Sequence, residues 1–109
     1  MSLKEKILIA DDSEMNQMLL EEILSDKYEY VMAKDGTEAV DILEKNEDID
    51  LVMLDINMPK MDGFGVLEIM NLRHWISEVP VIIISSENDV DFIRRGYDLG
   101  ASDYISRPF

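Results

Sequence analysis

The acidic side chains of this chain that could do chemistry stand directly after hydrophobic runs. Asp11 and Asp12 follow a first run, and Asp55 follows a second run, Leu51–Leu54. If these runs are neighbouring parallel strands, their carboxyl ends open into one crevice, and the three carboxylates meet there. Clustered acids repel one another unless a cation joins them, and Mg²⁺ prefers oxygen ligands. We therefore expect a Mg²⁺ site formed by these carboxylates and the backbone carbonyl of Asn57.

Two further side chains are expected at the same edge of the sheet. Ser85 follows the run Pro80–Ile84, and Arg107 follows a short run near the end of the chain. A metal ion, a hydroxyl and a fixed cation suit the transfer of a phosphoryl group to a carboxylate, because that reaction depends on positioning and charge neutralisation. Asp55 is the expected acceptor, and an ionised carboxylate needs no general base. The single histidine, His74, is therefore predicted to be a surface residue.

Each acid also has a purely structural alternative. An Asp after a strand often caps the next turn, and this alternative applies to Asp55. Asp11 and Asp12 could instead cap a helix that begins near Ser13. The expected convergence of all three acids with Ser85 favours the chemical interpretation.

Length and composition limit the classes of protein that the chain fits. Its 109 residues suit one domain, and 47% hydrophobic residues suffice for a core. Twenty-four acidic residues against ten basic ones give a net charge of −14, so we expect no direct binding to nucleic acids or to membranes. The absence of Cys excludes disulfides and thiol chemistry. Because the apolar runs are too short to span a bilayer, we predict a cytoplasmic location.

Short apolar runs alternate along the chain with segments of helical period. The expected strands are 7–10, 28–33, 51–54, 80–84 and 103–105, and the expected helices contain 19–24, 39–43, 64–70 and 90–99. This alternation predicts an α/β fold with right-handed crossovers covering both faces of a parallel sheet. We expect a flavodoxin-like doubly wound sheet of five strands in the order 2-1-3-4-5. In that order the first and third strands end at one crevice.

These motifs resemble the receiver domain of bacterial two-component response regulators. The resemblance covers nearly the whole chain, so the expected domain is 1–109. The matching segments are Asp11-Asp12, Asp55 with Met58-Pro59 and Met61-Asp62-Gly63, Pro80–Ile82 leading to Ser85, and Gly100–Tyr104 leading to Arg107-Pro108-Phe109. Their combination is specific, although no single motif is. The resemblance implies a phosphorylation-dependent signalling switch, regulatory in nature rather than an enzyme with an external substrate.

The resemblance also implies roles for the acids. Asp55 would receive a phosphoryl group from a sensor histidine kinase or a phosphotransfer protein. Asp12, Asp55 and the Asn57 carbonyl would hold Mg²⁺, and Asp11 would support it partly through water.

A further set of residues would carry the switch, by the same resemblance. Ser85 would hydrogen-bond the phosphoryl group, and its inward movement would leave space for Tyr104, which becomes buried on activation. Tyr104 would be a half-buried strand aromatic in any case. Asn57 and Glu87 match positions that tune hydrolysis of the aspartyl phosphate, and phosphorylation would favour a homodimer.

Two features depart from the family pattern. The family nearly always has Lys where this chain has Arg107, whose larger, planar guanidinium could still pair with phosphate but would alter the switch. The chain also ends at Phe109, where the family continues into a fifth helix. We expect that last helix to be missing from this chain, which a truncated chain or a swapped helix would explain, and an apolar strip to be exposed. The segment Trp75–Phe109 resembles receivers fused to output modules such as diguanylate cyclases.

Three other functions compete with this interpretation. A pseudo-receiver, which docks partners without phosphorylation, is favoured only by Arg107. Haloacid-dehalogenase-like phosphatases need a second Asp two residues after the nucleophile, where this chain has Asn57. A flavin or nucleotide binder would need a Gly-rich phosphate loop, which the chain lacks.

Overall fold

The computed structural model describes residues 5–24, 26–45, 48–86 and 89–106. The strands are β1 (Lys6–Ala10), β2 (Glu29–Ala33), β3 (Leu51–Leu54), β4 (Val81–Ser85) and β5 (Asp103–Ser106). The helices are α1 (Glu14–Leu24), α2 (Gly36–Lys45), α3 (Gly63–Leu72) and α4 (Val90–Asp98), with a short 3₁₀ helix, η1 (Trp75–Ser77), before β4. Within these residues, every helix falls short of the length and apolar character that a membrane crossing requires.

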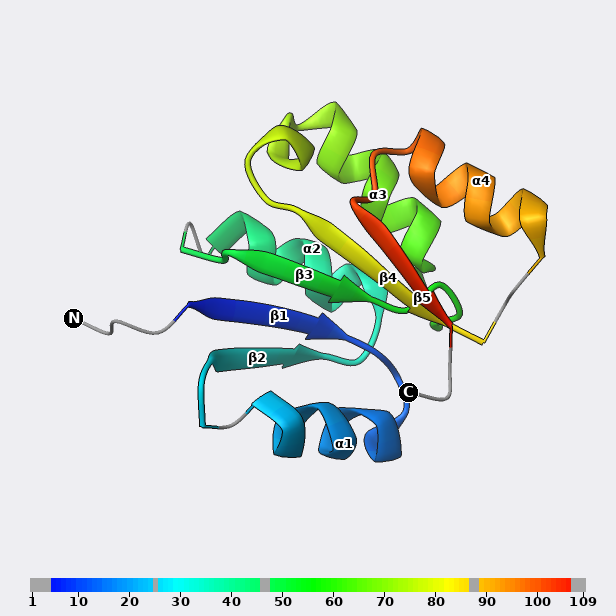
Figure 1. The fold of residues 1–109 in the computed structure, drawn as a ribbon. Coiled ribbons are helices and arrows are strands. Elements are labelled where there is room, and N and C mark those ends of the chain that lie inside the picture. The colour runs from blue at the N-terminus through cyan, green and yellow to red at the C-terminus, as the bar shows by residue number, and fades with distance from the viewer. Residues whose placement is uncertain (1–4, 25, 46–47, 87–88, 107–109) are drawn as a thin grey trace.

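The five strands form one parallel sheet in the order β2-β1-β3-β4-β5 (Figure 1). This order confirms the predicted flavodoxin-like fold. β1 pairs with β3 in a register that sets Ala10 opposite Leu54, and β4 pairs with β5 so that Ser85 is opposite Ser106. The carboxyl ends of β1 and β3 therefore lie side by side at the point where the strand order changes direction.

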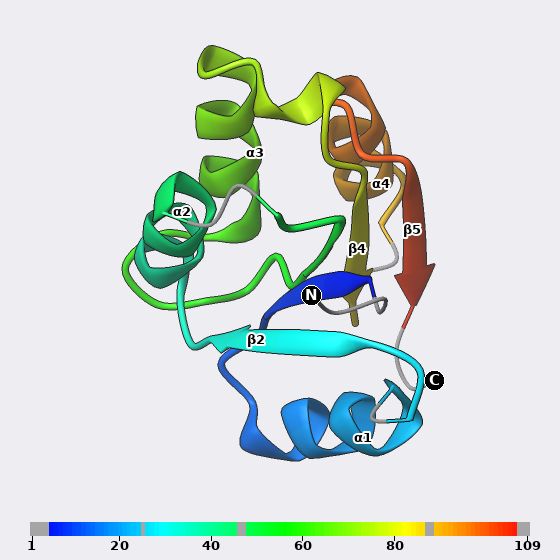
Figure 2. The same cartoon turned by 90° about the vertical axis from the view of Figure 1, so that its left-hand side faces the viewer.

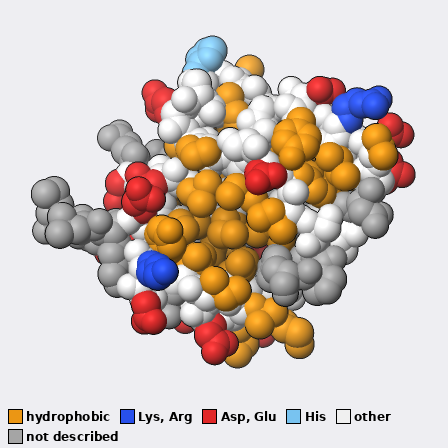
Figure 3. Space-filling model, in the orientation of Figure 1, with side chains coloured by type: hydrophobic (Ala, Val, Ile, Leu, Met, Phe, Trp, Pro, Cys, Tyr) orange, Lys and Arg blue, Asp and Glu red, His pale blue; other side chains and the backbone are white. Residues whose placement is uncertain are grey.

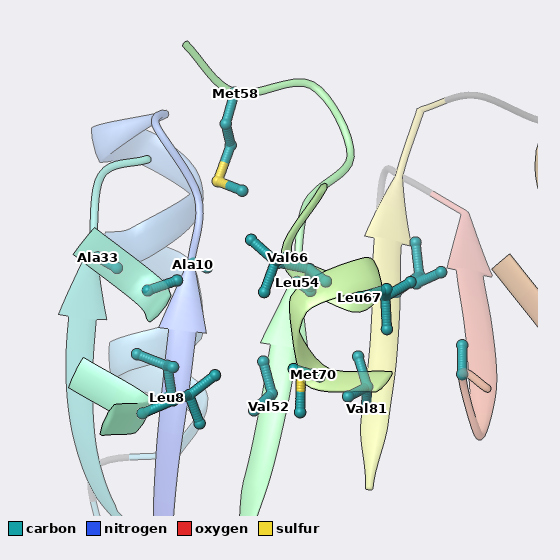
Figure 4. Close-up of a cluster of buried hydrophobic side chains, with 14 of the residues drawn as sticks. Leu8, Ala10, Ala33, Val52, Leu54, Met58, Val66, Leu67, Met70 and Val81 are labelled. Atoms are coloured by element: carbon teal, nitrogen blue, oxygen red, sulfur yellow. The ribbon is translucent and has the colours of Figure 1, made fainter. Parts of the chain in front are cut away.

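Helices lie on both faces of the sheet. α1 lies on one face, and α2, α3 and α4 lie on the other (Figures 1 and 2). Every second residue of β3, Val52 and Leu54, points into the larger core, which also contains side chains of α3 (Figure 4). The most deeply buried of those α3 side chains are Val66, Leu67 and Met70. A strand that is apolar at every position matches this fold, because both of its faces meet hydrophobic groups.

Among the described residues, the face of the sheet that carries α1 is incompletely covered. Leu51 and Met53 of β3 and Ile82 of β4 pack toward this side and are half-buried. Ile105 of β5 is 38% exposed. Figure 3 shows hydrophobic side chains gathered across the middle of the sheet on this side. This surface agrees with the apolar strip expected from the sequence.

Some boundaries differ from the expected ones. Pro80 lies just before β4 rather than within it, because proline has no N–H to donate to the neighbouring strand. Its carbonyl still accepts from the N–H of Val52 at 3.0 Å. Ser85 is the last residue of β4 instead of the first residue after it. Leu99 caps α4 and lies outside the helix. His74 is exposed, as predicted. It has a left-handed φ of 63° and directly precedes η1, a short helix that was not expected from the sequence.

Candidate functional site

Three carboxylates meet at the carboxyl ends of β1 and β3. Asp11 and Asp12 directly follow β1, and Asp55 directly follows β3. One carboxylate oxygen from each residue lies within 4.8 Å of the others. Asp11 and Asp55 are 2% and 3% exposed, whereas Asp12 is open to solvent. The strand order thus brings together acids that are far apart in the sequence.

Backbone contacts fix the end of β1. The N–H of Asp11 donates to the carbonyl of Ala33 at 3.0 Å, and the side-chain amide of Gln17 donates to the carbonyl of Asp11 at 2.5 Å. The N–H of Ser13 donates to Oδ1 of Asp11 at 2.9 Å, and the hydroxyl of Ser13 accepts from the N–H of Asn16 at 3.3 Å. The Ser13 hydroxyl therefore accepts from the first turn of α1, and the Asp11 carboxylate orients the turn before that helix.

The loop after β3 carries Asp55 and Asn57. The N–H of Asp55 donates to the carbonyl of Ala10 at 2.9 Å, and the N–H of Asn57 approaches Oδ1 of Asp55 at 3.4 Å. The N–H of Gly63 donates to the carbonyl of Ile56 at 2.8 Å and closes the loop onto α3. A Cβ at Gly63 would overlap the carbonyl oxygen of Asp55, so only glycine allows this approach. Asp55 is thus held by backbone contacts on both of its sides.

Ser85 and Tyr104 lie on the two strands beyond β3. Ser85 is completely buried at the end of β4. Leu54 pairs with Ile83, so Ser85 lies two residues further along, at the same edge of the sheet as Asp55. Tyr104 on β5 is opposite Ile83 and is half-buried, as a strand aromatic is expected to be.

Two predicted site residues, Arg107 and Glu87, lie outside the described residues. β5 ends at Ser106, which is opposite Ser85 in the sheet. The roles assigned to Arg107 and Glu87 therefore stay predictions.

The donor set at this edge fits a hard divalent cation. Mg²⁺ takes oxygen ligands at about 2.1 Å, so two opposite ligands of an octahedral ion lie about 4.2 Å apart. The carboxylate oxygens of Asp11, Asp12 and Asp55 lie within 4.8 Å of one another, so a small side-chain rotation brings them into that range. The exposure of Asp12 leaves a solvent side for the waters that Mg²⁺ usually retains.

Gln17 was not expected from the sequence to lie at the site, and it contacts the backbone just after β1 and at the end of β2. Its amide donates to the carbonyl of Asp11 at 2.5 Å and approaches the carbonyl of Ala33 at 3.5 Å. No sequence signal marks a helix glutamine that reaches across to two strands, because the contact depends on how α1 packs.

Asp35, a buried acid that precedes α2, was also not expected from the sequence. Its Oδ1 accepts from the hydroxyl of Thr37 at 2.6 Å and from the N–H of Glu38 at 2.9 Å. These two hydrogen bonds, with the charge of Lys60, hold the pKa of Asp35 below its ordinary value of 3.8, although burial opposes them. An Asp directly before Gly36 at a helix start is typical of an N-cap, and this signal could have been used.

Comparison with known proteins identifies the class that this fold and site define. The family described as "Response regulator receiver domain" matches residues 7–109. The chain therefore belongs to the response regulator receiver domains, which are regulatory components of two-component signalling.

Three similar proteins show the extent of the match. "Probable transcriptional regulator ycf27" of Porphyridium aerugineum is 43% identical over 107 residues, which cover 97% of this chain and 43% of that protein. The phosphorylated cyanobacterial phytochrome response regulator RcpA is 31% identical with a TM-score of 0.89, over 96% of this chain and 81% of that one. A chain of the CheX-CheY-BeF3-Mg²⁺ complex from Borrelia burgdorferi is 33% identical with a TM-score of 0.81, over 95% and 78%. Our chain thus spans less than half the length of the curated relative.

Proposed function

We propose that this domain is a phosphorylation-dependent switch in which Asp55 accepts a phosphoryl group from a phosphohistidine of a sensor histidine kinase or phosphotransfer protein. The observation that carries the proposal is the buried Asp55 carboxylate, with oxygens of two further acids within 4.8 Å. An Asp55 oxygen forms a bond to phosphorus while the bond from phosphorus to the imidazole nitrogen breaks. The electron pair of the broken bond stays on that nitrogen.

The acids would hold Mg²⁺ during this transfer. Asp12, Asp55 and the carbonyl of Asn57 are the proposed direct ligands, and Asp11 acts partly through water. When bound, Mg²⁺ neutralises the charge of the carboxylates and of the incoming phosphoryl group. The buried position of Asp11, fixed by its contacts with Gln17 and Ser13, supports a role in orienting that site. The Mg²⁺ named in the Borrelia burgdorferi complex gives further support.

Two other groups complete the proposed phosphoryl site. The Ser85 hydroxyl would donate to a phosphoryl oxygen, and Arg107 would pair with the phosphoryl charge. The position of Ser85 at the end of β4, at the same edge as Asp55, supports the first role. Asn57 and Glu87 would tune the rate at which the aspartyl phosphate hydrolyses.

The same serine would operate the switch through Tyr104. Ser85 and Tyr104 lie on neighbouring strands, and the register sets Tyr104 opposite Ile83, two residues before Ser85. Gly96 of α4 faces the Tyr104 ring, so that a Cβ built there would stand 3.6 Å from it. Movement of Ser85 toward a phosphoryl group would therefore change the space for Tyr104 beside α4, which supports a signalling surface there. A homodimer on phosphorylation stays a prediction.

An output module is the proposed recipient of the signal. The relative from Porphyridium aerugineum is named a probable transcriptional regulator, and this chain matches less than half of it. That similarity favours a linked transcriptional output, and fusion to a diguanylate cyclase stays a prediction from sequence alone. The half-covered apolar face offers a packing surface for a further helix. A cytoplasmic location also stays a prediction.

Intact-protein mass after incubation with acetyl phosphate and Mg²⁺ tests the proposal. The wild-type chain should gain one phosphoryl mass, and a chelator or the Asp55→Ala substitution should abolish the gain. Asp98→Ala, which removes an exposed Asp at the end of α4, is the matched control and should leave the gain intact.

The alternative is a pseudo-receiver that docks partners without phosphorylation. The convergence of the three acids with Ser85 makes this the less favoured function. A wild-type chain that binds Mg²⁺ but gains no mass from acetyl phosphate or from a phosphorylated kinase would overturn our proposal in its favour.

A further inference from the structure

The loop that follows the acceptor site is fastened to the start of α2 by two contacts. The N–H of Gly36 donates to the carbonyl of Met61 at 3.0 Å. Nζ of Lys60 faces Oδ2 of Asp35 at 3.7 Å. We call these two contacts the α2 clamp. They join residues of the β2–α2 junction to residues of the β3–α3 loop.

Asp35 is a well-fixed anchor for this clamp. It is 4% exposed, and its Oδ1 is held by the hydroxyl of Thr37 and the N–H of Glu38. The other carboxylate oxygen, Oδ2, is the one that faces Lys60. One oxygen therefore serves the helix start and the other serves the loop.

The loop side of the clamp adopts a backbone conformation that needs support. Lys60 has a φ of 67°, in the left-handed region that non-glycine residues rarely occupy. Such a conformation persists where the surroundings hold it in place. A Cβ on Gly36 would overlap the carbonyl oxygen of Met61, so the approach of the two segments also requires glycine.

The clamped residues lie close to the proposed metal ligands along one short loop. Asn57, whose carbonyl is a proposed ligand, precedes Lys60 by three residues, and Met58 between them is 9% exposed and packs into the core. The loop from Asp55 is therefore anchored in the core at Met58 and to α2 at Lys60 and Met61. A change in either clamp contact would shift the backbone that carries the Asn57 carbonyl.

We propose that Asp35 and Lys60 are positioning residues, which hold the β3–α3 loop so that the Asn57 carbonyl is placed for Mg²⁺. This inference rests on the proposed function, because it names what sets the affinity of that metal site. It assigns no direct contact with the ion to Asp35 or Lys60.

Calorimetric titration of the chain with Mg²⁺ tests the inference. Asp35→Asn keeps the Oδ1 acceptor for α2 but removes the charge, and Lys60→Met removes the charge but keeps an aliphatic stem. Each should weaken Mg²⁺ binding by about two- to fivefold. The expected effect is modest because the Lys60 side chain is solvent-exposed. The double variant should bind Mg²⁺ no more weakly than either single variant. Lys60→Arg, which keeps the positive charge, should retain the wild-type affinity.

A matched control separates positioning from general stability. Lys45 makes an ion pair with Asp41 within α2, at 3.1 Å; both side chains are exposed, and neither belongs to the α2 clamp. Lys45→Met should leave Mg²⁺ affinity unchanged. Gly36→Ala, which acts on the other clamp contact, should weaken Mg²⁺ binding by about tenfold.

The outcomes distinguish this inference from the proposed function. Wild-type affinity in Asp35→Asn and Lys60→Met, in a chain whose Mg²⁺ binding is abolished by Asp12→Ala, would overturn the clamp alone. A wild-type chain that does not bind Mg²⁺ would overturn the metal site, and the clamp inference with it. Equal loss of affinity in Lys45→Met would show that the effect is one of general stability, and would also overturn the clamp.

Discussion

The backbone N–H of Asp55 donates to the carbonyl oxygen of Ala10 at 2.9 Å. Ala10 is the last residue of β1 and immediately precedes Asp11, so this bond continues the β1–β3 ladder into the site. It sets the separation between acids that follow two different strands. The charges of the cluster are thus held together by the sheet itself, with consequences for stability and for metal binding.

Neutralising Asp12 should stabilise the metal-free domain. The Asp12→Asn substitution removes one of three charges whose oxygens lie within 4.8 Å of one another. We expect the free energy of unfolding to rise by about 1 kcal/mol in chelator, a modest value because Asp12 is exposed. Urea unfolding measures it, with Glu29→Gln on β2 as a control for loss of a surface charge. A destabilised Asp12→Asn protein would contradict the repulsion argument.

Mg²⁺ should make the wild-type chain more stable than Asp12→Asn, the reverse of the order expected in chelator. A ligand that binds only the folded state adds about 2.7 kcal/mol at a free concentration 100 times its dissociation constant. The wild-type chain should gain this stabilisation, and Asp12→Asn should gain much less because a proposed ligand is gone. The same urea titrations at increasing Mg²⁺ check it, and equal gains in both proteins would argue against Asp12 as a ligand.

Asp35 should increase the free energy of unfolding by an amount that is lost at acid pH. Its pKa is lowered in the folded chain, chiefly by the hydroxyl of Thr37, so the unfolded chain binds the proton more readily. The contribution is complete above the ordinary pKa of 3.8 and is lost as the pH falls through the lower folded-state pKa. The free energy of unfolding should therefore differ most between wild type and Asp35→Asn near neutral pH. The difference should shrink as the pH falls below the ordinary pKa of 3.8, and a constant difference across pH would refute it.

Two glycines in the first turn of α3 should respond differently to alanine. A Cβ at Gly63 would overlap the backbone carbonyl of Asp55, whereas a Cβ at Gly65 would meet the flexible Met61 side chain at 2.7 Å. We expect Gly63→Ala to lower the free energy of unfolding by about 2 kcal/mol, through overpacking against backbone. Gly65→Ala should change it by less than about 1 kcal/mol, because better helix propensity offsets the contact. Chemical denaturation compares the two, and equal effects would contradict the role of the Asp55 backbone.

Replacing Arg107 by the family's usual Lys should change the response to phosphorylation more than it changes phosphorylation itself. Arg107→Lys should still accept a phosphoryl group, because either cation can neutralise it, but the smaller ammonium would change the coupling to Tyr104. Phosphoryl incorporation by mass and dimerisation by light scattering measure the two effects separately. Unchanged incorporation together with an unchanged dimerisation response would refute the second part.

The arrangement of the strands and the meeting of Asp11, Asp12 and Asp55 could be predicted because their signals are local. Continuous apolar runs mark strands that are buried on both faces, and right-handed crossovers leave few strand orders for such a pattern. An acid that directly follows such a run must then lie at the sheet edge. The boundaries of β4 were less predictable, because Ser85 is a polar residue that completes a buried strand.

The sequence by itself thus determined the fold class, the family and the edge of the sheet where the acids gather. Only the tertiary structure decided that Gln17 reaches the carbonyl of Asp11, that Asp35 faces Lys60, and that one sheet face is partly open. Strand and helix patterns depend on residues a few positions apart, so a sequence displays them directly. Contacts between two loops depend on how helices pack on the sheet and on backbone angles such as the left-handed φ of Lys60, and no local pattern specifies these.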